Sequence, residues 1–361
     1  MATQNTSGQR RKKKSAKKTR NVVILVAEVL VLAVMLGVLW FVTRATDEEK
    51  GIQRVEIQED EVTINEGVQE NVKLEKYRNI ALFGLDSTVG ELTLNTRSDT
   101  IMIASINNET KEVRLMSVYR DTYLNLGNDT YNKCNAAYAK GGPKQAISML
   151  NMNLDLDITD FVAVGFKGVI DVVDAVGGIY IEVDSAELEH INNYQISISE
   201  NLKTTYTPVK QTGYQLLDGM QATAYCRIRY TAGDDFKRTE RQREVLQAIM
   251  DKVKNMDVAS LTKIANNVFS NFYTSVELSE VLSLLSDVPS YVIVDEGGFP
   301  SNEYRTGATI GGIGSSVICT DLEQAVVDFH KRFFADEEYQ VSDTLKKISQ
   351  TIHANTDAYV R

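Results

Sequence analysis

The sequence predicts an α/β (α+β) fold in which helices flank a mixed central sheet. Short apolar segments with the side-chain alternation of β-strands recur along the chain, and segments with the apolar spacing of helices lie between them. The chain has 361 residues, of which 43% are hydrophobic and 24% are charged, so it can bury a substantial core. No internal repeat is visible in the sequence.

Six strands are predicted from apolar segments that are bounded by glycine, asparagine or acidic residues. The short turn at Asn107-Asn108-Glu109 predicts that the second and third strands pair as a hairpin. The predicted strands are Arg78–Asp86, Thr96–Asn107, Glu112–Thr122, Phe161–Phe166, Ile179–Val183 and Ser290–Gly298.

Glycine and proline mark the ends of the predicted helices. Pro143 follows a glycine pair and opens a helix through about Met152, because the N–H that proline lacks is not needed in a first turn. A second glycine pair ends the short helix Gly168–Val176. Residues 184–212 are polar, and we expect an irregular surface excursion there. The later predicted helices are Leu217–Tyr225, Arg238–Met256, Ala259–Asn271, Leu278–Ser286 and Asp321–Phe334.

The N-terminal residues predict a membrane anchor. Residues 1–20 hold eight basic side chains and no acidic one, whereas the rest of the chain carries 31 basic and 49 acidic residues. Residues 21–43 are apolar and long enough to cross roughly 30 Å of hydrocarbon, with no small-residue cleavage site after them. We therefore expect an uncleaved signal anchor in the cell membrane, crossing it once, with the N-terminus cytoplasmic. A nucleic-acid-binding tail is disfavoured because the apolar span follows the basic cluster directly.

The remaining boundaries follow from composition. Residues 44–76 are charged and polar, and we expect a juxtamembrane stalk. Residues 77–335 form the predicted extracellular globular domain, and residues 336–361 form a polar C-terminal tail that is helical in part. Of the three cysteines, any pair could be bridged, and their spacing does not fit a zinc site.

A group of arginines between Ala224 and Leu246 predicts a phosphate-binding site. Arg227 and Arg229 have the period-two spacing that places both on one face of an extended segment. Arg238, Arg241 and Gln242 have helical spacing, so they would lie on one side of the following helix. Guanidinium groups that converge from two elements suit phosphate oxygens, which accept paired hydrogen bonds. The alternative is a solvated helix face that neighbouring glutamates neutralise.

Two aspartates at strand margins add a predicted metal site. Asp86 and Asp99 lie at the ends of neighbouring predicted strands, and paired carboxylates near phosphate oxygens suit magnesium. The alternative is that both aspartates cap turns. Arg120 ends the third strand and would add to the arginine group, and Lys133 would add a point charge or else lie on plain surface. Only three histidines are present and they lie far from these motifs, so a Ser-His-Asp or Cys-His arrangement is poorly supported.

Taken in order, these motifs resemble a known family. GLD, RSDT, SVYRDT, NKCNAAYAKGG, GFKGVIDVVDAVGGI, LLDGMQATAYCRIR and DDFKRTERQREVL follow one another between Asn79 and Leu246. This pattern is similar to the LytR-CpsA-Psr family of Gram-positive envelope proteins, whose members also carry an N-terminal anchor. The sequence departs from the family's usual pattern at Tyr119, Lys140 and Lys237, which concerns pocket shape rather than the charged groups.

The resemblance implies a phosphotransferase of the cell envelope. Such an enzyme moves a glycopolymer (teichoic acid, capsule or a related polymer) from an undecaprenyl-pyrophosphate carrier to a peptidoglycan hydroxyl and forms a phosphodiester. The fold it implies is a mixed sheet flanked by helices, with the polyprenyl tail in an apolar pocket. Two other functions remain open: a non-catalytic regulator that binds polyprenyl phosphates, and a polyprenyl-pyrophosphate phosphatase. The topology disfavours a regulator that acts on DNA.

The resemblance also assigns roles to residues of this chain. Asp86 and Asp99 would hold Mg²⁺ (or Mn²⁺), and with Arg227 and Arg229 they form the expected catalytic set. The implied pyrophosphate-binding residues are Arg97, Arg120, Lys133, Arg227, Arg229, Arg238, Arg241 and Gln242.

Overall fold

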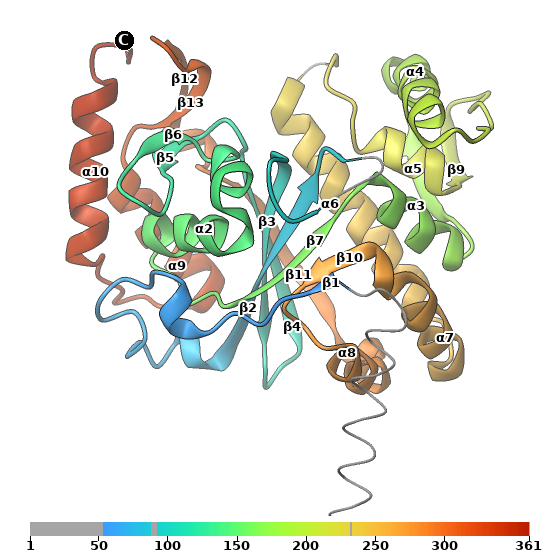
Figure 1. The fold of residues 1–361 in the computed structure, drawn as a ribbon, viewed down its shortest axis with the longest axis horizontal. Coiled ribbons are helices and arrows are strands. Elements are labelled where there is room, and N and C mark those ends of the chain that lie inside the picture. The colour runs from blue at the N-terminus through green and yellow to red at the C-terminus, as the bar shows by residue number, and fades with distance from the viewer. Residues whose placement is uncertain (1–52, 88–91, 232, 361) are drawn as a thin grey trace, which may run out of the picture. The chain divides into compact units, whose positions relative to one another are not determined.

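A seven-stranded mixed sheet forms the centre of the protein (Figure 1). The computed structural model describes residues 53–87, 92–231 and 233–360, so the predicted basic tail and the apolar segment 21–43 lie outside the described residues. No helix in the described ranges has the length and apolarity to span a membrane. In spatial order the strands are β1 (Gln53–Arg54), β10 (Phe272–Thr274), β7 (Asp160–Val164), β2 (Tyr77–Leu85), β3 (Ser98–Asn107), β4 (Glu112–Val118) and β11 (Val292–Phe299).

The pairing of these strands confirms the predicted mixed sheet. β2, β3 and β4 are antiparallel neighbours, and β3 and β4 form the predicted hairpin. β7 pairs with β2 in parallel, and β11 pairs with β4 in parallel. Because β2 and β3 are antiparallel, the C-terminal end of β2 and the N-terminal end of β3 meet at one edge of the sheet.

The sheet is covered on both faces, as the alternation of side chains along β2 and β3 requires. Phe83, Ile101 and Ile103 point into the main core, which α2 (Ala136–Leu154), α9 (Leu322–Phe334) and α10 (Asp343–Thr356) complete. Met102 and Ala104 point to the opposite face, where Leu246 of α6 (Asp234–Val253) packs against them.

A smaller core lies beside the sheet and includes side chains from the C-terminal half of α6. It is built by α3 (Phe166–Ala175), β8 (Ile179–Val183), α4 (Ser185–Leu202), β9 (Gly213–Leu217) and α5 (Gly219–Tyr225). β8 and β9 form a separate antiparallel pair. Figure 1 shows these elements in green and yellow on the side of the sheet away from α9 and α10.

The prediction of an irregular excursion over residues 184–212 was wrong, because most of this stretch is α4. The Asp184 carboxylate accepts from the N–H of Glu187, and the Glu187 carboxylate accepts from the N–H of Asp184, which forms a capping box. The inward face carries few apolar side chains, and the buried Gln195 is one of its polar members. This polar composition hid the helix in the sequence.

Several shorter elements complete the described chain. The remaining helices are α7 (Val258–Val268) and α8 (Leu278–Leu284), and two small hairpins pair β5 (Tyr123–Asn125) with β6 (Tyr131–Lys133) and β12 (Arg305–Ile310) with β13 (Gly314–Cys319). Short 3₁₀ helices are η1 (Glu59–Glu61), η2 (Leu74–Lys76), η3 (Phe269–Asn271), η4 (Leu285–Ser290) and η5 (Asn302–Tyr304). The glycine pair that was expected to open a helix is a kink inside α2, and Gly142 has a φ of 65° there.

The compact unit is longer than the predicted domain 77–335 in both directions. Its described residues run from Gln53 to Val360. Val62 and Leu74, which belong to the predicted stalk, are buried in the main core. Leu345 and Ile352 of α10 are buried in the same core, so the expected polar tail is a packed amphipathic helix.

Candidate active site

A cavity of about 460 Å³ lies between the sheet and the helices α3 and α6. Its polar end carries six of the predicted site residues, and its remaining wall is mainly apolar. The polar residues are Asp86, Asp99, Arg227, Arg229, Arg238 and Gln242. The apolar wall includes Leu82, Met102, Val162, Val164, Leu246 and Ile249. One continuous space therefore joins a strongly charged end to a hydrocarbon-lined interior.

Sheet register brings the two predicted aspartates to the polar end. Leu85 of β2 pairs with Ser98 of β3, so Asp86 and Asp99 follow at the same edge of the sheet. The backbone N–H of Asp86 donates to the carbonyl of Arg97 at 3.4 Å, so the two segments stay hydrogen-bonded beyond the last paired residues of the strands. Asp86 is exposed and Asp99 is half-buried.

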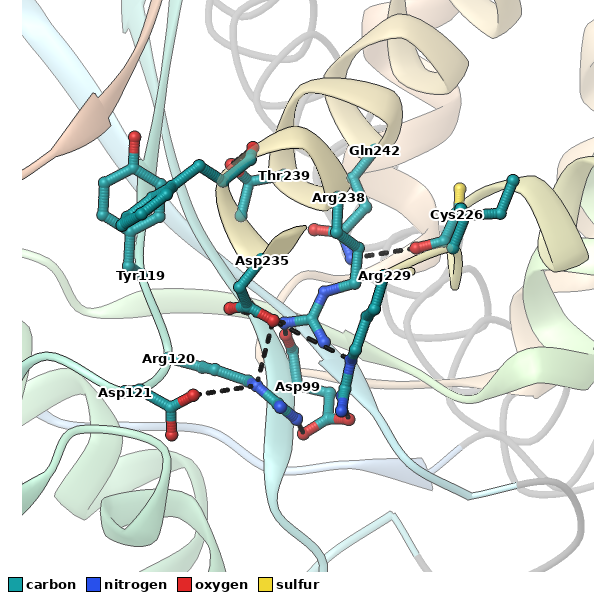
Figure 2. Close-up of polar contacts among 12 residues, drawn as sticks. Asp99, Tyr119, Arg120, Asp121, Cys226, Arg229, Asp235, Arg238, Thr239 and Gln242 are labelled. Atoms are coloured by element: carbon teal, nitrogen blue, oxygen red, sulfur yellow. Dashed lines mark hydrogen bonds and ion pairs between the residues drawn. The ribbon is translucent and has the colours of Figure 1, made fainter. Parts of the chain in front are cut away.

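Three arginines surround Asp99 (Figure 2). Arg120 Nη1 lies 2.6 Å from Asp99 Oδ1, and Arg229 Nη2 lies 3.0 Å from Asp99 Oδ2. Arg238 Nη2 donates to the backbone carbonyl of Asp99 at 3.0 Å. The cluster thus combines guanidinium groups from the end of β4, the segment after α5 and the first turns of α6, as the sequence predicted.

Asp235 is a site residue that the sequence analysis missed. Its Oδ1 lies 3.0 Å from Arg238 Nη2, 3.5 Å from Arg120 Nε and 3.8 Å from Arg229 Nε (Figure 2). Burial raises the pKa of Asp235, and the three arginines act against that rise. Its position three residues before Arg238, at the start of a helix, was the available signal.

Burial and the surrounding carboxylates act in opposite directions on the arginines. Burial lowers the pKa of Arg238 to about 10, although Asp235 favours the charged form. At Arg120 burial also disfavours the charge, but Asp99, Asp235 and Asp121 outweigh it and the pKa is raised. Both guanidinium groups stay positively charged at neutral pH, so each can donate charge-assisted hydrogen bonds to an anion.

Lys133 contacts the arginine cluster only through another residue. Its Nζ forms an ion pair with Asp121 Oδ1 at 3.0 Å, and Asp121 Oδ2 lies 3.6 Å from Arg120 Nε. Lys133 therefore reaches the arginine cluster through Asp121 and does not line the cavity. Arg97 is exposed and does not line the cavity either.

Arg227 and Arg229 do not lie on the predicted extended segment. The chain after α5 continues as a turn, in which the N–H of Arg227 donates to the carbonyl of Ala224 at 3.0 Å. The alternating spacing of the two arginines therefore wrongly predicted an extended backbone. Both side chains nevertheless line the cavity.

The predicted role of Arg241 in pyrophosphate binding does not fit its position. Arg241 is buried, its Nε donates to Glu187 Oε1 at 2.7 Å, and its Nη2 donates to Thr231 Oγ1 at 2.8 Å. It joins α6 to α4 and does not line the cavity. Gln242 does line the cavity, and its Nε2 donates to the carbonyl of Cys226 at 3.4 Å.

The two cavity carboxylates are compatible with a divalent cation only if other ligands complete its shell. Asp99 accepts one arginine hydrogen bond at each oxygen, and a carboxylate offers about four lone-pair positions, so two remain. Asp86 forms no side-chain hydrogen bond or ion pair with the described residues. No cluster of three or more acidic, histidine or cysteine side chains suited to a metal occurs in the described ranges. Phosphate oxygens and water would have to supply the rest, which is the usual environment of magnesium.

The cysteines take no part in this chemistry. Cys134, Cys226 and Cys319 are free thiols. Cys226 lines the cavity, but burial raises its pKa to about 12 and keeps it protonated.

Comparison with known proteins identifies the family. The profile of the LytR_cpsA_psr family matches residues 38–308, which is more than half of the chain. The chain belongs to this family. The resemblance read from the motifs is therefore confirmed.

The family's relatives include named transferases. Biofilm regulatory protein A of Streptococcus mutans is 34% identical over 263 residues, which cover 69% of this chain and 61% of that protein. The polyisoprenyl-teichoic acid–peptidoglycan teichoic acid transferase TagU of Enterococcus faecalis is 30% identical over 225 residues, which cover 62% of this chain and 69% of TagU. The chain thus spans about three fifths of the length of Biofilm regulatory protein A.

Solved structures of the family share the fold. The structure of the LytR-CPS2A-psr family protein YwtF (TagT) with bound octaprenyl pyrophosphate lipid aligns with a TM-score of 0.57 and 22% identity, over 78% of this chain and 99% of that chain. TagT is a Bacillus subtilis protein. The crystal structure of TagV of the same organism aligns with a TM-score of 0.55 and 23% identity, over 79% of this chain and 99% of TagV.

Proposed function

We propose that this protein transfers a glycopolymer from a polyprenyl-pyrophosphate carrier to a hydroxyl of peptidoglycan. One observation carries the proposal: a single cavity joins an arginine-rich end to a long apolar wall. A ligand that fits both parts has an anionic head and a hydrocarbon tail. The names of relatives support the same conclusion, since TagU is named a teichoic acid transferase and TagT is described with a polyprenyl pyrophosphate lipid.

The carrier would lie with its pyrophosphate at the polar end and its isoprenoid chain along the apolar wall. Arg229 and Arg238 would donate to the phosphate oxygens, because guanidinium groups form paired hydrogen bonds with them. Leu82, Val162 and Ile249 would contact the first isoprene units. The carrier that we propose is undecaprenyl pyrophosphate, as the resemblance to the family implies.

The transfer would be a substitution at one phosphorus atom. The acceptor hydroxyl oxygen forms a new P–O bond to the phosphorus that bears the glycopolymer, while the bond from that phosphorus to the bridging oxygen breaks. The products are a phosphodiester and a polyprenyl monophosphate, and the hydroxyl proton passes to a carboxylate. In the absence of a bound metal Asp86 would take that proton, because it lies exposed at the polar end of the cavity.

The arginines would supply the main catalytic effect. Negative charge grows on the bridging oxygen as the bond breaks, and fixed cations in a half-buried site stabilise it without reorganisation. Asp99 and Asp235 hold Arg120, Arg229 and Arg238 in place before the ligand arrives. A Mg²⁺ (or Mn²⁺) ion held by Asp86 and Asp99 would add further charge neutralisation at the phosphates.

This function requires the cavity to face the membrane and the cell wall. We propose that the N-terminal segment anchors the protein in the cell membrane, with the domain outside. The peptidoglycan acceptor and the lipid carrier would then both be accessible to the polar end.

A transfer assay with the purified full-length protein tests the proposal. The substrates are a polyprenyl-pyrophosphate-linked oligosaccharide and a peptidoglycan fragment, with and without Mg²⁺, and mass spectrometry detects the phosphodiester product. We expect product with wild type, loss of about 100-fold or more in Arg229→Gln, and near-normal product in Arg332→Gln. Arg332 is a matched control because its guanidinium also holds a carboxylate, that of Asp295, away from the cavity.

The same assay separates the other two functions. Release of inorganic phosphate or polyprenyl monophosphate without any acceptor would indicate a phosphatase. Tight binding of the carrier with no product under any condition would indicate a non-catalytic regulator. Either result would contradict the transferase proposal.

A further inference from the structure

Arg227 differs from the other arginines at the polar end of the cavity. Arg120, Arg229 and Arg238 each form ion pairs with Asp99 or Asp235. Within the described residues no carboxylate forms an ion pair with Arg227, and its buried Nη1 has no hydrogen-bond partner. The cavity therefore holds one guanidinium whose charge its own carboxylates do not neutralise by direct contact.

Two aromatic rings contact this guanidinium instead. The Cζ atom of Arg227 lies over the ring of Phe166, 4.4 Å from its centroid, and over the ring of Tyr194, 5.2 Å from its centroid. Both rings also line the cavity. Aromatic faces attract a cation, but they do not occupy its N–H groups, which lie in the guanidinium plane.

Both rings are fixed by their own elements. The N–H of Phe166, the first residue of α3, donates to the carbonyl of Ser87 at 3.0 Å, and a side chain at the preceding Gly165 would come within 2.6 Å of that same carbonyl. Tyr194 lies on α4 and packs against the smaller core. Burial raises the pKa of Tyr194, so its ring stays neutral near the arginines.

We infer that Tyr194 and Phe166 are positioning residues that hold Arg227 with its N–H donors free for a phosphate group of the ligand. The inference rests on the proposed function, because it assumes that the cavity binds a polyprenyl pyrophosphate. A carboxylate in place of the rings would hold Arg227 equally well but would compete with the phosphate for the same donors. Burial lowers the pKa of Arg227, although Asp86 favours the charged form, so an anionic group that contacts this guanidinium directly stabilises its charge.

The test compares two substitutions at Tyr194 in the purified full-length protein. Tyr194→Leu keeps an apolar side chain without a π face, whereas Tyr194→Phe keeps the ring and serves as the matched control. Calorimetry measures binding of geranylgeranyl pyrophosphate and of geranylgeraniol, which has the same tail and no phosphate. We expect Tyr194→Leu to weaken pyrophosphate binding by about tenfold, Tyr194→Phe to restore it, and neither to change binding of the alcohol. Phe166→Leu is a second variant with the same expectation, and thermal melting verifies that each variant is folded.

A double-mutant cycle with Arg227→Gln makes the test specific. If the ring acts through Arg227, Tyr194→Leu has no further effect on pyrophosphate binding once Arg227 is replaced. Equal losses for the pyrophosphate and the alcohol, or an undiminished effect in the Arg227→Gln background, would show that the rings only shape the wall and would overturn the inference. Unchanged pyrophosphate binding in folded Tyr194→Leu and Phe166→Leu would overturn it as well. Failure of the wild type to bind geranylgeranyl pyrophosphate at all would instead reject the proposed function, and the inference with it.

Discussion

Arg241 of α6 and Arg229 of the segment before α6 have different roles, and only their surroundings distinguish them. Arg241 is 1% exposed and holds the carboxylate of Glu187, which is itself buried. Arg229, in the preceding turn, has a side chain that is 31% exposed and holds Asp99 at the cavity. The first arginine stabilises the fold, and the second belongs to the site.

This contrast gives a prediction for two variants. Arg241→Met leaves a buried carboxylate without its partner, so we expect the free energy of unfolding to fall by about 3–5 kcal/mol. Arg229→Met should lower it by no more than about 1 kcal/mol while transfer is lost. Urea unfolding monitored by circular dichroism measures both values. Equal stability losses in the two variants would contradict this division of roles.

Helix geometry explains which site residues the sequence could indicate. Successive residues of an α-helix are rotated by about 100°, so Gln242 is about 40° from Arg238, whereas Arg241 is about 60° from it on the other side. The sequence predicted Arg241 and Gln242 on the same helix face as Arg238. In the structure only Gln242 lines the cavity together with Arg238. Asp86, Asp99, Arg120 and Arg238 were predictable because strand ends and helix starts fix their positions. The ion pairs of Asp235 depend on tertiary contacts that no local pattern records.

At the scale of elements, a close approach of two helices sets the position of the turn that carries Arg227. Gly219 begins α5, and its N–H donates to Asp174 Oδ1 of α3 at 2.7 Å. A Cβ atom at Gly219 would lie 2.3 Å from the carbonyl oxygen of Ile170. Only a glycine allows the two backbones this contact.

We therefore expect Gly219→Ala to lower the free energy of unfolding by about 1–3 kcal/mol, because the added methyl must push α5 away from α3. Gly307→Ala is the matched control, since no atom lies within 4 Å of a Cβ there. Chemical unfolding of both variants checks the prediction. A Gly219→Ala protein as stable as Gly307→Ala would show that the helices can separate freely.

Elements were predictable where an apolar pattern marks them. The alternation along β2, β3 and β4 and the apolar stripe of α9 give their bounds to within a few residues. α4 and α10 were missed or underestimated because their inward faces are narrow and their sequences polar. In both, capping residues and tertiary contacts stabilise a helix that composition alone does not indicate.

On the scale of the whole molecule, a buried polar cluster joins segments from both ends of the described chain. The carboxylate of Asp155 accepts hydrogen bonds from Asn65, from the hydroxyl of Tyr339 and from the N–H of Ser342. The ring of His330 stacks on Tyr339 with the centroids 3.7 Å apart, and its Nε2 donates to the carbonyl of Leu154 at 2.8 Å. The other ring nitrogen is buried and has no partner among the described residues.

The buried imidazole predicts a dependence of stability on pH. Burial lowers the pKa of His330 from 6.5 to about 4, although nearby Asp155 and Asp336 act against this shift. The unfolded chain therefore binds a proton between pH 6.5 and pH 4 that the folded protein does not. The contribution is fully present above about pH 6.5 and is lost as the pH falls toward 4.

His330→Gln isolates this effect, because an amide can still donate to Leu154 but does not titrate. We expect the difference in unfolding free energy between wild type and this variant to shift against the wild type by about 3 kcal/mol from pH 7 to pH 4. Urea unfolding at a series of pH values measures it. Parallel pH profiles for the two proteins would show that the folded protein accommodates the charged imidazole.

The order of strands in the sheet also has a consequence for how the chain reaches its native state. β1, at residues 53 and 54, pairs with β10, at residues 272 to 274, and β10 in turn pairs with β7. β4 likewise pairs with β11, which lies far along the chain at residues 292 to 299. Contacts between segments so distant in sequence slow folding, because the entropy of closing long loops is lost before the contacts form. The local β2–β3–β4 meander can form early, so the strands that carry the cavity aspartates would assemble first and both edges of the sheet last.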